Sequence, residues 1–269
     1  MGIIIKRVLL VMLLVSATAM QAADEVPDDL QLRLGGYILA DQSTDVKLSH
    51  NGTGVTVNLQ DAFKMEKSAQ VIRFDGYYRF TPKHSIEFAW YAIHNSSHTD
   101  KDFPWFEDNI SASGNLNTFF NTDIYKVNYV YSFYHSDEVE IGLSAGLHIT
   151  ELELGFDGTY ELNGSGENAE QSVGVTAPLP VIGLRLSYNI LPSLRVKYEV
   201  DYFFVTFDGA VGSMSDSLLT LDYRIFKHFG LGIGINSTRM RFEADVGENG
   251  ILNLNHDVAG GLFYATANF

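Results

Sequence analysis

The amino-acid sequence predicts an all-β fold: a single antiparallel transmembrane β-barrel of about ten strands. Three observations lead to this prediction. Segments in which apolar and polar residues alternate recur along the chain, and several reach the length of a tilted membrane strand. Short turns alternate with long polar stretches. The mean hydropathy of +0.01 is too low for a bundle of membrane helices, but it suits a barrel wall with one apolar face.

The first 22 residues have the pattern of a secretory signal peptide. Two basic residues precede the apolar run Val8–Val15, and small residues follow it. The run is too short to anchor the chain in a bilayer. We therefore assign residues 1–22 to a cleaved signal peptide and residues 23–269 to the barrel. The pattern fits cleavage after Ala19 and cleavage after Ala22, and it does not decide between them.

The alternation is clearest in Leu194–Phe204. Leucine, valine, tyrosine and phenylalanine occupy one face of this segment. The other face carries four charged residues, which are Arg195, Lys197, Glu199 and Asp201. Successive side chains of a strand point to opposite sides, so this strand has one apolar face and one charged face. In chain order, the expected strands lie near 30–40, 72–80, 86–95, 125–133, 139–150, 181–190, 194–204, 218–226, 231–242 and 252–269.

The connections between these strands differ in length on the two sides of the predicted barrel. Tight turns are expected at 81–84, 134–137, 191–193 and 226–228, and long polar loops near 41–67, 95–119, 154–176 and 243–251. Short periplasmic turns and long extracellular loops are typical of outer-membrane barrels. An even number of strands then leaves both termini on the periplasmic side.

A soluble sandwich or barrel also alternates, with its apolar residues inside. The aromatic residues decide between the two. Phe80, Phe133, Tyr188 and Tyr223 lie near strand ends, where a membrane barrel carries its interfacial girdle. The chain ends in Phe269, and a terminal aromatic on a lipid-facing strand resembles the assembly signal of bacterial outer-membrane proteins. We therefore expect a location in the Gram-negative outer membrane, with lipids, lipopolysaccharide and the barrel-assembly machinery as partners.

Four segments carry a resemblance to a known family. Leu34–Tyr37, Arg73–His84, Asp123–Val127 and Gly142–His148 look like the corresponding parts of a family of poorly characterised Gram-negative outer-membrane β-barrel proteins. The resemblance covers the whole mature chain. It implies the fold and the location, and it implies no particular chemistry.

The composition excludes several classes of function. The chain of 269 residues has no cysteine, which rules out a disulfide scaffold and a cysteine nucleophile. Its net charge of −15 provides no basic stripe for phosphates, so we expect no nucleic-acid partner. The acidic loops lack the spacing of a calcium-binding loop, and we expect neither a metal site nor a cofactor.

The polar faces of the strands place many charged residues in the lumen. Besides Arg33, these are Arg73, Asp75, Arg79, Glu87, Lys126, Glu140, Arg185, Arg195, Lys197, Glu199, Asp201, Asp222 and Arg224. Charges this dense must pair or stay hydrated, because an isolated buried charge costs several kcal/mol. They form either the lining of a narrow gated pore or a structural network that fills the barrel. The network is favoured, since barrels of about eight strands are just filled by side chains.

Two patterns raise the question of catalysis. His148 and Thr150 are similar to the His-x-Ser of outer-membrane lipid hydrolases, but threonine replaces serine and the pair faces the lumen. Glu151 and Glu153 place carboxylates near the outer rim without the aspartate and histidine pattern of outer-membrane proteases. We therefore expect no catalytic residues and no enzyme. The leading hypothesis is a structural or surface-interaction barrel with a narrow gated pore as an option. A porin-like channel for small solutes and a lipid or peptide hydrolase are the alternatives.

Overall fold

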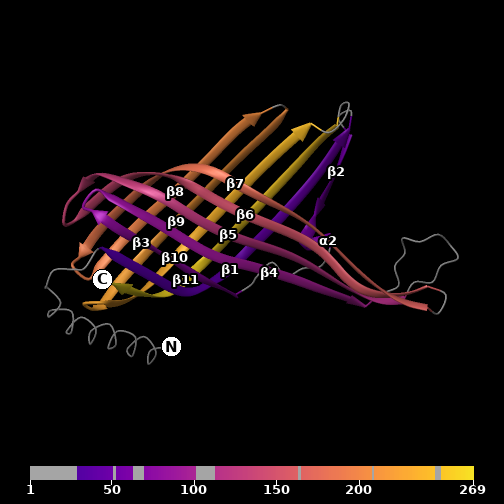
Figure 1. Ribbon diagram of the computed structural model, residues 1–269, viewed down its shortest axis with the longest axis horizontal. Helices are drawn as coiled ribbons and strands as arrows, with labels where there is room; N and C mark the ends of the chain where they lie inside the picture. Colours follow the sequence, from indigo (N-terminus) through magenta and orange to yellow (C-terminus); the bar gives the residue numbers. More distant parts are fainter. Residues whose placement is uncertain are drawn as a thin grey trace, which may run out of the picture.

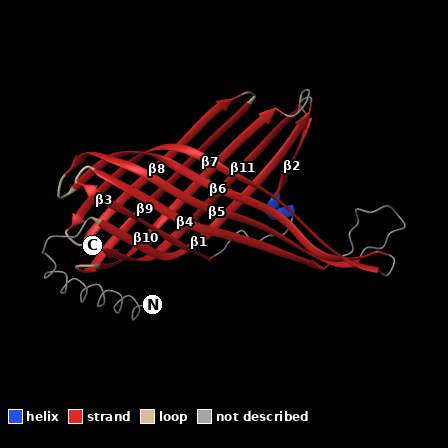
Figure 2. Ribbon diagram, viewed as in Figure 1, coloured by secondary structure: helices blue, strands red, loops and turns tan. Residues whose placement is uncertain are grey.

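The computed structural model describes residues 29–50, 53–62, 70–100, 113–162, 165–207, 209–245 and 250–269, and the proposed signal peptide lies outside them. Its elements are β1 (Leu30–His50), β2 (Thr53–Asn58), α2 (Leu59–Ala62), β3 (Gln70–Thr81), β4 (His84–Asp100), β5 (Ser113–His135), β6 (Val139–Leu162), β7 (Ser165–Leu191), β8 (Leu194–Phe207), β9 (Ala210–Phe226), β10 (Phe229–Asp245) and β11 (Gly250–Asn268). Figures 1 and 2 show the strands lying side by side, tilted, around the wall of the barrel. No helix among the described residues is long and apolar enough to cross a membrane.

The predicted barrel is confirmed. Each strand pairs with its neighbour in the chain, and β11 closes the sheet by pairing with β1, so ten strands form an antiparallel barrel. The extra strand β2 folds back on the upper part of β1 as a hairpin. In the half of the barrel where all ten strands pair, closure satisfies the backbone of each strand between two neighbours, which is the condition for a sheet to span a bilayer.

The strands are much longer than the sequence pattern indicates. β6 has 24 residues and β7 has 27, so most of the stretch predicted as a loop near 154–176 is strand. Much of the expected loops near 41–67 and 95–119 is also strand, in β1, β2, β4 and β5. A bilayer needs only about 9–11 residues per tilted strand. Beyond that depth the outward face has no lipid to contact and becomes polar, so the pattern of a lipid-facing strand is lost even where Leu152 and Leu154 still alternate with charged residues.

The wall divides at its extracellular side between β7 and β8. Their pairing ends at Ile182 opposite Tyr202, whereas β7 continues along β6 to Ser165 and β8 continues along β9. Pro178 and Pro180 lie just beyond this point on β7. Proline has no N–H to donate and is therefore confined to strand edges and bulges. Figure 1 shows the consequence, because the ends of β4 to β7 diverge from those of β8 to β11.

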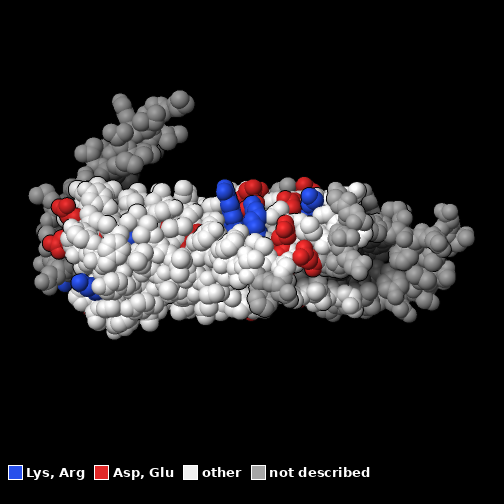
Figure 3. Space-filling view, turned by 90° about the horizontal axis from the view of Figure 1, so that it is seen from above, with Lys and Arg blue, Asp and Glu red and all other residues white. Residues whose placement is uncertain are grey.

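An apolar belt surrounds the half of the barrel next to the periplasmic turns. Its side chains point outward and are largely exposed, including Leu34, Val127, Ile182, Ile233 and Phe263. Farther out the same strand faces become charged. Arg241 and Asp257 form an ion pair of 2.8 Å there, with both side chains about two-fifths exposed. Figure 3 shows a broad uncharged surface followed by a band of charged side chains.

Phe269 lies at the periplasmic end of the seam that closes the barrel. Its backbone exchanges two hydrogen bonds with Leu30, of 2.8 and 2.9 Å, and its ring stacks on His228. The side chain is 55% exposed in the barrel, where it faces the lipid side. Its position suits a role in assembly, when the open edge of β11 must be recognised.

Deletion of Phe269 should lower the amount of protein in the outer membrane of cells much more than it lowers stability. The half-exposed ring contributes at most about 1–2 kcal/mol to the folded state. The measurement is the outer-membrane level of the deletion variant beside the refolding yield of the purified chain in detergent. Normal outer-membrane levels would refute the assembly-signal prediction, and failure to refold would assign Phe269 a structural role instead.

Candidate functional site

The candidate site is the lumen, where charged side chains from eight strands meet. The predicted residues face inward, and ten of them are buried: Arg33, Arg73, Asp75, Arg79, Lys126, Arg185, Lys197, Glu199, Asp201 and Asp222. Glu87 and Glu140 are partly buried within the same network. Arg195 and Arg224 lie near the periplasmic turns, where Arg195 donates to Asn189 and Arg224 donates to the carbonyl of Pro192.

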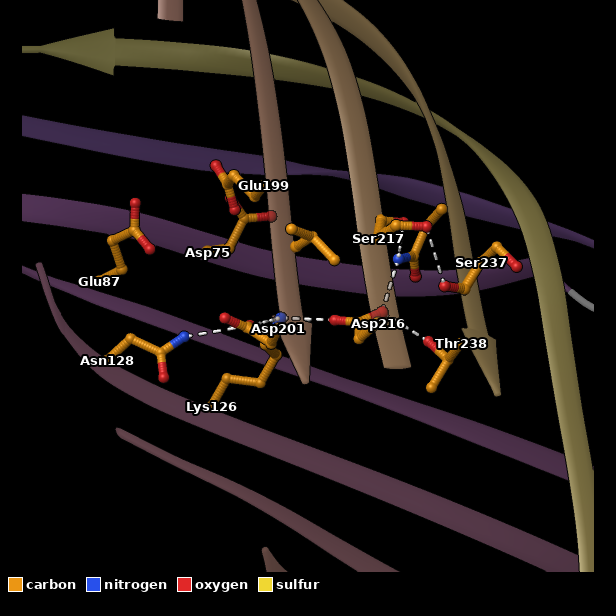
Figure 4. A network of polar contacts seen from close by, with 12 residues as sticks. Asp75, Glu87, Lys126, Asn128, Glu199, Asp201, Asp216, Ser217, Ser237 and Thr238 are labelled. Carbon is orange, nitrogen blue, oxygen red and sulfur yellow. Dashed lines mark hydrogen bonds and ion pairs between the residues drawn. The ribbon is translucent and has the colours of Figure 1, made fainter. Parts of the chain in front are cut away.

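The centre of the network is one lysine between two aspartates (Figure 4). Lys126 Nζ lies 2.9 Å from Asp201 and 2.5 Å from Asp216. The two aspartates are direct partners across β8 and β9, so their carboxylates are neighbours on the same face. Lys126 comes from β5 on the opposite wall. The ammonium therefore neutralises two adjacent carboxylates and ties two sides of the barrel together.

Each of these aspartates has further donors. Asp216 accepts hydrogen bonds from Asn236 at 2.8 Å and from Thr238 at 2.6 Å. Asp201 accepts one from Arg185 at 2.8 Å and one from Asn128 at 3.2 Å. Buried carboxylates are tolerated when charged and neutral donors together satisfy their lone pairs. The centre of the lumen meets this condition.

A second cluster lies beside the first. Asp75 contacts Arg33 directly and accepts from Arg73 Nε at 2.9 Å. Arg33 also lies 3.5 Å from Glu199, which in turn is 3.3 Å from the ammonium of Lys197. The chain of alternating charges thus runs from β1 and β3 to β8.

Two more ion pairs cross the lumen between β4 and β7 and between β3 and β6. Arg185 Nε donates to Glu87 at 2.7 Å. Nearer the periplasm, Arg79 forms a two-pronged pair with Glu140, with N–O distances of 3.0 and 2.9 Å. Two-pronged arginine–carboxylate pairs are among the strongest and most directional polar contacts. They fix the spacing of the strands that they join.

The network packs closely around its arginines. Two cavities border the arginines there, each of about 20 Å³, which is room for about one water molecule. A side chain added at Gly183 would place its Cβ 2.5 Å from both Asp201 and Ser144, too close for any atom to pack. The charges also nearly balance, since eight cations (Arg33, Arg73, Arg79, Lys126, Arg185, Arg195, Lys197 and Arg224) face seven carboxylates (Asp75, Glu87, Glu140, Glu199, Asp201, Asp216 and Asp222).

Above the charges, toward the extracellular side, the lumen becomes apolar and then capped. A buried cluster that includes Tyr37, Tyr91 and Ile93 packs over the network. The turn of helix α2 then inserts Gln60, which is 1% exposed, among the strand ends. Its side-chain oxygen accepts from the backbone N–H of Thr44 at 2.7 Å. A polar layer, an apolar layer and a cap therefore lie in series.

Sequence reasoning missed Asp216 and Gln60. The expected strand near 218–226 begins two residues too late to include Asp216, and extension of its alternation back from Asp222 would have placed Asp216 in the lumen. Gln60 follows a short hairpin with no periodic pattern of its own. The pairing of β2 with β1 folds α2 back against β1 and places Gln60 beside Thr44.

The residues considered for catalysis do not form a catalytic arrangement among the described residues. His148 and Thr150 both face the lumen and are buried, as their alternation predicts. The Thr150 hydroxyl donates to Met240 Sδ at 4.0 Å, and no hydrogen bond joins it to His148. No group of three or more His, Asp or Glu side chains in this part of the chain could hold a metal ion.

No protein-family model and no curated protein sequence matches the chain. The chain is similar in fold to the outer membrane protease OmpT from Escherichia coli, with a TM-score of 0.54 and 15% identity over 93% of this chain and 99% of that one. It also aligns with the Pseudomonas putida toluene transporter TodX (TM-score 0.37, 10% identity, 90% and 91% covered) and with Ail of Yersinia pestis (TM-score 0.27, 8% identity, 88% and 97% covered). The fold is thus that of an outer-membrane β-barrel protein.

The expectation that the chain is not an enzyme is wrong as an inference from its fold. The barrel of OmpT, which covers nearly the whole chain, belongs to a protease, so a barrel of this shape is compatible with catalysis. At 15% identity the similarity extends to the fold and does not transfer an active site.

Proposed function

We propose that this chain is an integral protein of the Gram-negative outer membrane whose lumen is sealed and whose activity lies at its extracellular surface. The observation that carries the proposal is the Lys126 bridge between Asp201 and Asp216, which joins opposite walls at the centre of the barrel. The apolar belt supports the location, with membrane lipids around it and lipopolysaccharide at its outer edge. The exposed position of Phe269 supports insertion by the barrel-assembly machinery.

The energetics favour a seal over a pore. Withdrawal of an ion from water costs several kcal/mol, and only close, well-oriented partners offset this cost. Opening a water path through the lumen would separate several ion pairs at once. The hydrogen-bonded strands of the wall hold the charged side chains of these pairs in place. A ten-stranded barrel is also near the small end, where side chains alone can fill the interior.

The charge distribution supports a role for the outer surface. The whole chain carries −15, while the lumen is close to neutral, so the excess negative charge lies outside the lumen. Asp123, Glu151 and Glu153 contribute to it on the outward faces of β5 and β6 beyond the apolar belt. We propose that the extended strand ends contact a partner of positive charge.

The test of the seal is ion conductance in planar bilayers. The wild-type barrel should give no stepwise current. The variant that combines Glu87→Ala and Arg185→Ala with Tyr37→Ala and Tyr91→Ala should conduct, because it opens both the charged layer and the apolar layer. The matched control is Arg241→Ala with Asp257→Ala, which removes an ion pair from the outward face and should remain silent. Stepwise conductance of the wild type would overturn the seal and favour the small-solute channel.

A further inference from the structure

A row of soft metal ligands lies in the extracellular third of the lumen. Met214, Met240 and His256 are consecutive cross-strand partners on β9, β10 and β11. All three face inward, and Met214 and His256 are each 1% exposed. The β-carbons of direct cross-strand partners are about 4.5–5.5 Å apart, so two thioethers and one imidazole can converge on a single ion.

The methionines are concentrated at this one place. Met214 and Met240 are the only methionines in the described ranges, and they are direct partners on the lumenal face. Methionine fills gaps in apolar cores as well as binding metals. The neighbouring histidines distinguish the two roles here, because a gap in an apolar core calls for no imidazole.

His256 is held in the manner of a metal ligand. Its Nδ1 lies 2.9 Å from the hydroxyl oxygen of Thr44, and Gln60 donates to the same oxygen at 3.1 Å. When Nδ1 carries the proton and donates it to Thr44, the lone pair of Nε2 faces the lumen, and Nε2 has no protein partner. Metal-binding histidines are commonly oriented by such a hydrogen bond from the other ring nitrogen.

A second unpartnered imidazole faces the row from the opposite wall. Thr150 on β6 touches Met240 Sδ, and His148 is the next inward residue below it on the same strand. His148 is fully buried, and neither of its ring nitrogens has a hydrogen-bond partner. Buried polar atoms ordinarily have a hydrogen-bond partner, so two neighbouring histidines with unpartnered ring nitrogens call for a ligand.

The geometry points to a binding site for a soft monovalent metal ion, Cu⁺, with Met214, Met240 and His256 as ligands and His148 as the candidate fourth. Thioethers and imidazole select Cu⁺ over hard cations, which require oxygen ligands. Asp216, the nearest inward carboxylate on β9, is already bound by Lys126, Asn236 and Thr238. The site departs from the expectation of no metal, which rested on the absence of cysteine and on the spacing of the acidic loops.

The test uses Ag⁺ as a redox-stable probe for the same ligand set. The chain from residue 23 onward is labelled with ¹³C-methyl methionine and refolded in detergent, and its three methyl signals are followed during titration. The signals of Met214 and Met240 should shift and saturate at one equivalent, with Met65 as the internal reference. Saturating Ag⁺ that leaves the Met214 and Met240 signals unmoved would overturn the proposal.

Two variants and one competing metal sharpen this result. Met214→Leu with Met240→Leu should weaken Ag⁺ binding at least about 100-fold, whereas His228→Gln, at a periplasmic turn, should leave it unchanged. Slower migration after boiling than before on a detergent gel verifies that each variant is folded. Undiminished Ag⁺ affinity in the folded double-methionine variant, or equally tight binding of Zn²⁺ to the wild type, would contradict a soft-metal site.

Discussion

Replacement of Lys126 by methionine should destabilise the barrel by about 3–5 kcal/mol at neutral pH. Methionine keeps the length of the side chain but removes the only ammonium that lies within 3 Å of both Asp201 and Asp216. These aspartates are direct cross-strand partners, so the variant leaves two buried carboxylates side by side. Arg185, Asn128, Asn236 and Thr238 still donate to them, but the repulsion between the two charges is no longer offset.

The loss should depend on pH in a defined direction. In the variant, protonation removes the repulsion between the neighbouring carboxylates of Asp201 and Asp216, so the stability deficit should shrink as the pH is lowered. Urea unfolding of the refolded barrel, followed by the fluorescence of Trp90 in the belt, measures both effects. The matched control is Lys197→Met, whose ammonium pairs with Glu199 at 3.3 Å; this substitution should cost less, because Glu199 keeps Arg33 as a partner. A pH-independent deficit below about 1 kcal/mol for Lys126→Met would mean that the bridge does not stabilise the barrel.

Replacement of Val200 by arginine should cost about 2–4 kcal/mol, because it places a charge at mid-depth on the lipid face. Val200 lies on β8 between Tyr198 and Tyr202, which are 37% and 50% exposed on the same face. The control is Thr176→Arg, the same substitution on an exposed outward position of β7 beyond the belt, beside Glu151. Urea unfolding in lipid vesicles should show a large loss for Val200→Arg and almost none for Thr176→Arg. Equal losses would place both positions in the same environment and reject the belt.

The wall of the barrel is the part of the fold that the sequence predicts best. A strand with lipid on one side must alternate, and Leu194–Phe204 has this alternation over its whole length. The tight turns at 81–84, 134–137, 191–193 and 226–228 are found where expected, since each separates two strands of strong alternation. The outward apolar face ends where the membrane ends. In the upper parts of β6 and β7 the outward face carries Glu151 and Glu153, whereas Leu152 and Leu154 stay on the inward face, and the length of the two strands follows from pairing with each other.

The site was accessible to sequence reasoning only in part. The inward direction of Arg79 and Glu140 follows from alternation, but their pairing does not, because β3 and β6 meet only across the closed lumen. The same holds for Lys126 with its two aspartates. Gln60 and the row of Met214, Met240 and His256 depend on register between strands that a single sequence does not specify.

The most direct test of the sealed membrane barrel is the reactivity of single cysteines toward a water-soluble thiol reagent. The chain has no cysteine of its own, so each introduced thiol reports alone. In lipid vesicles we expect Thr176→Cys to react, and we expect no reaction at Leu219→Cys in the belt or at Ser144→Cys and Thr220→Cys in the lumen. All four should react after unfolding in urea. Reaction of the folded protein at Ser144→Cys or Thr220→Cys would reveal a water-filled lumen, and reaction at Leu219→Cys would show that the belt does not face lipid; either result would contradict the account.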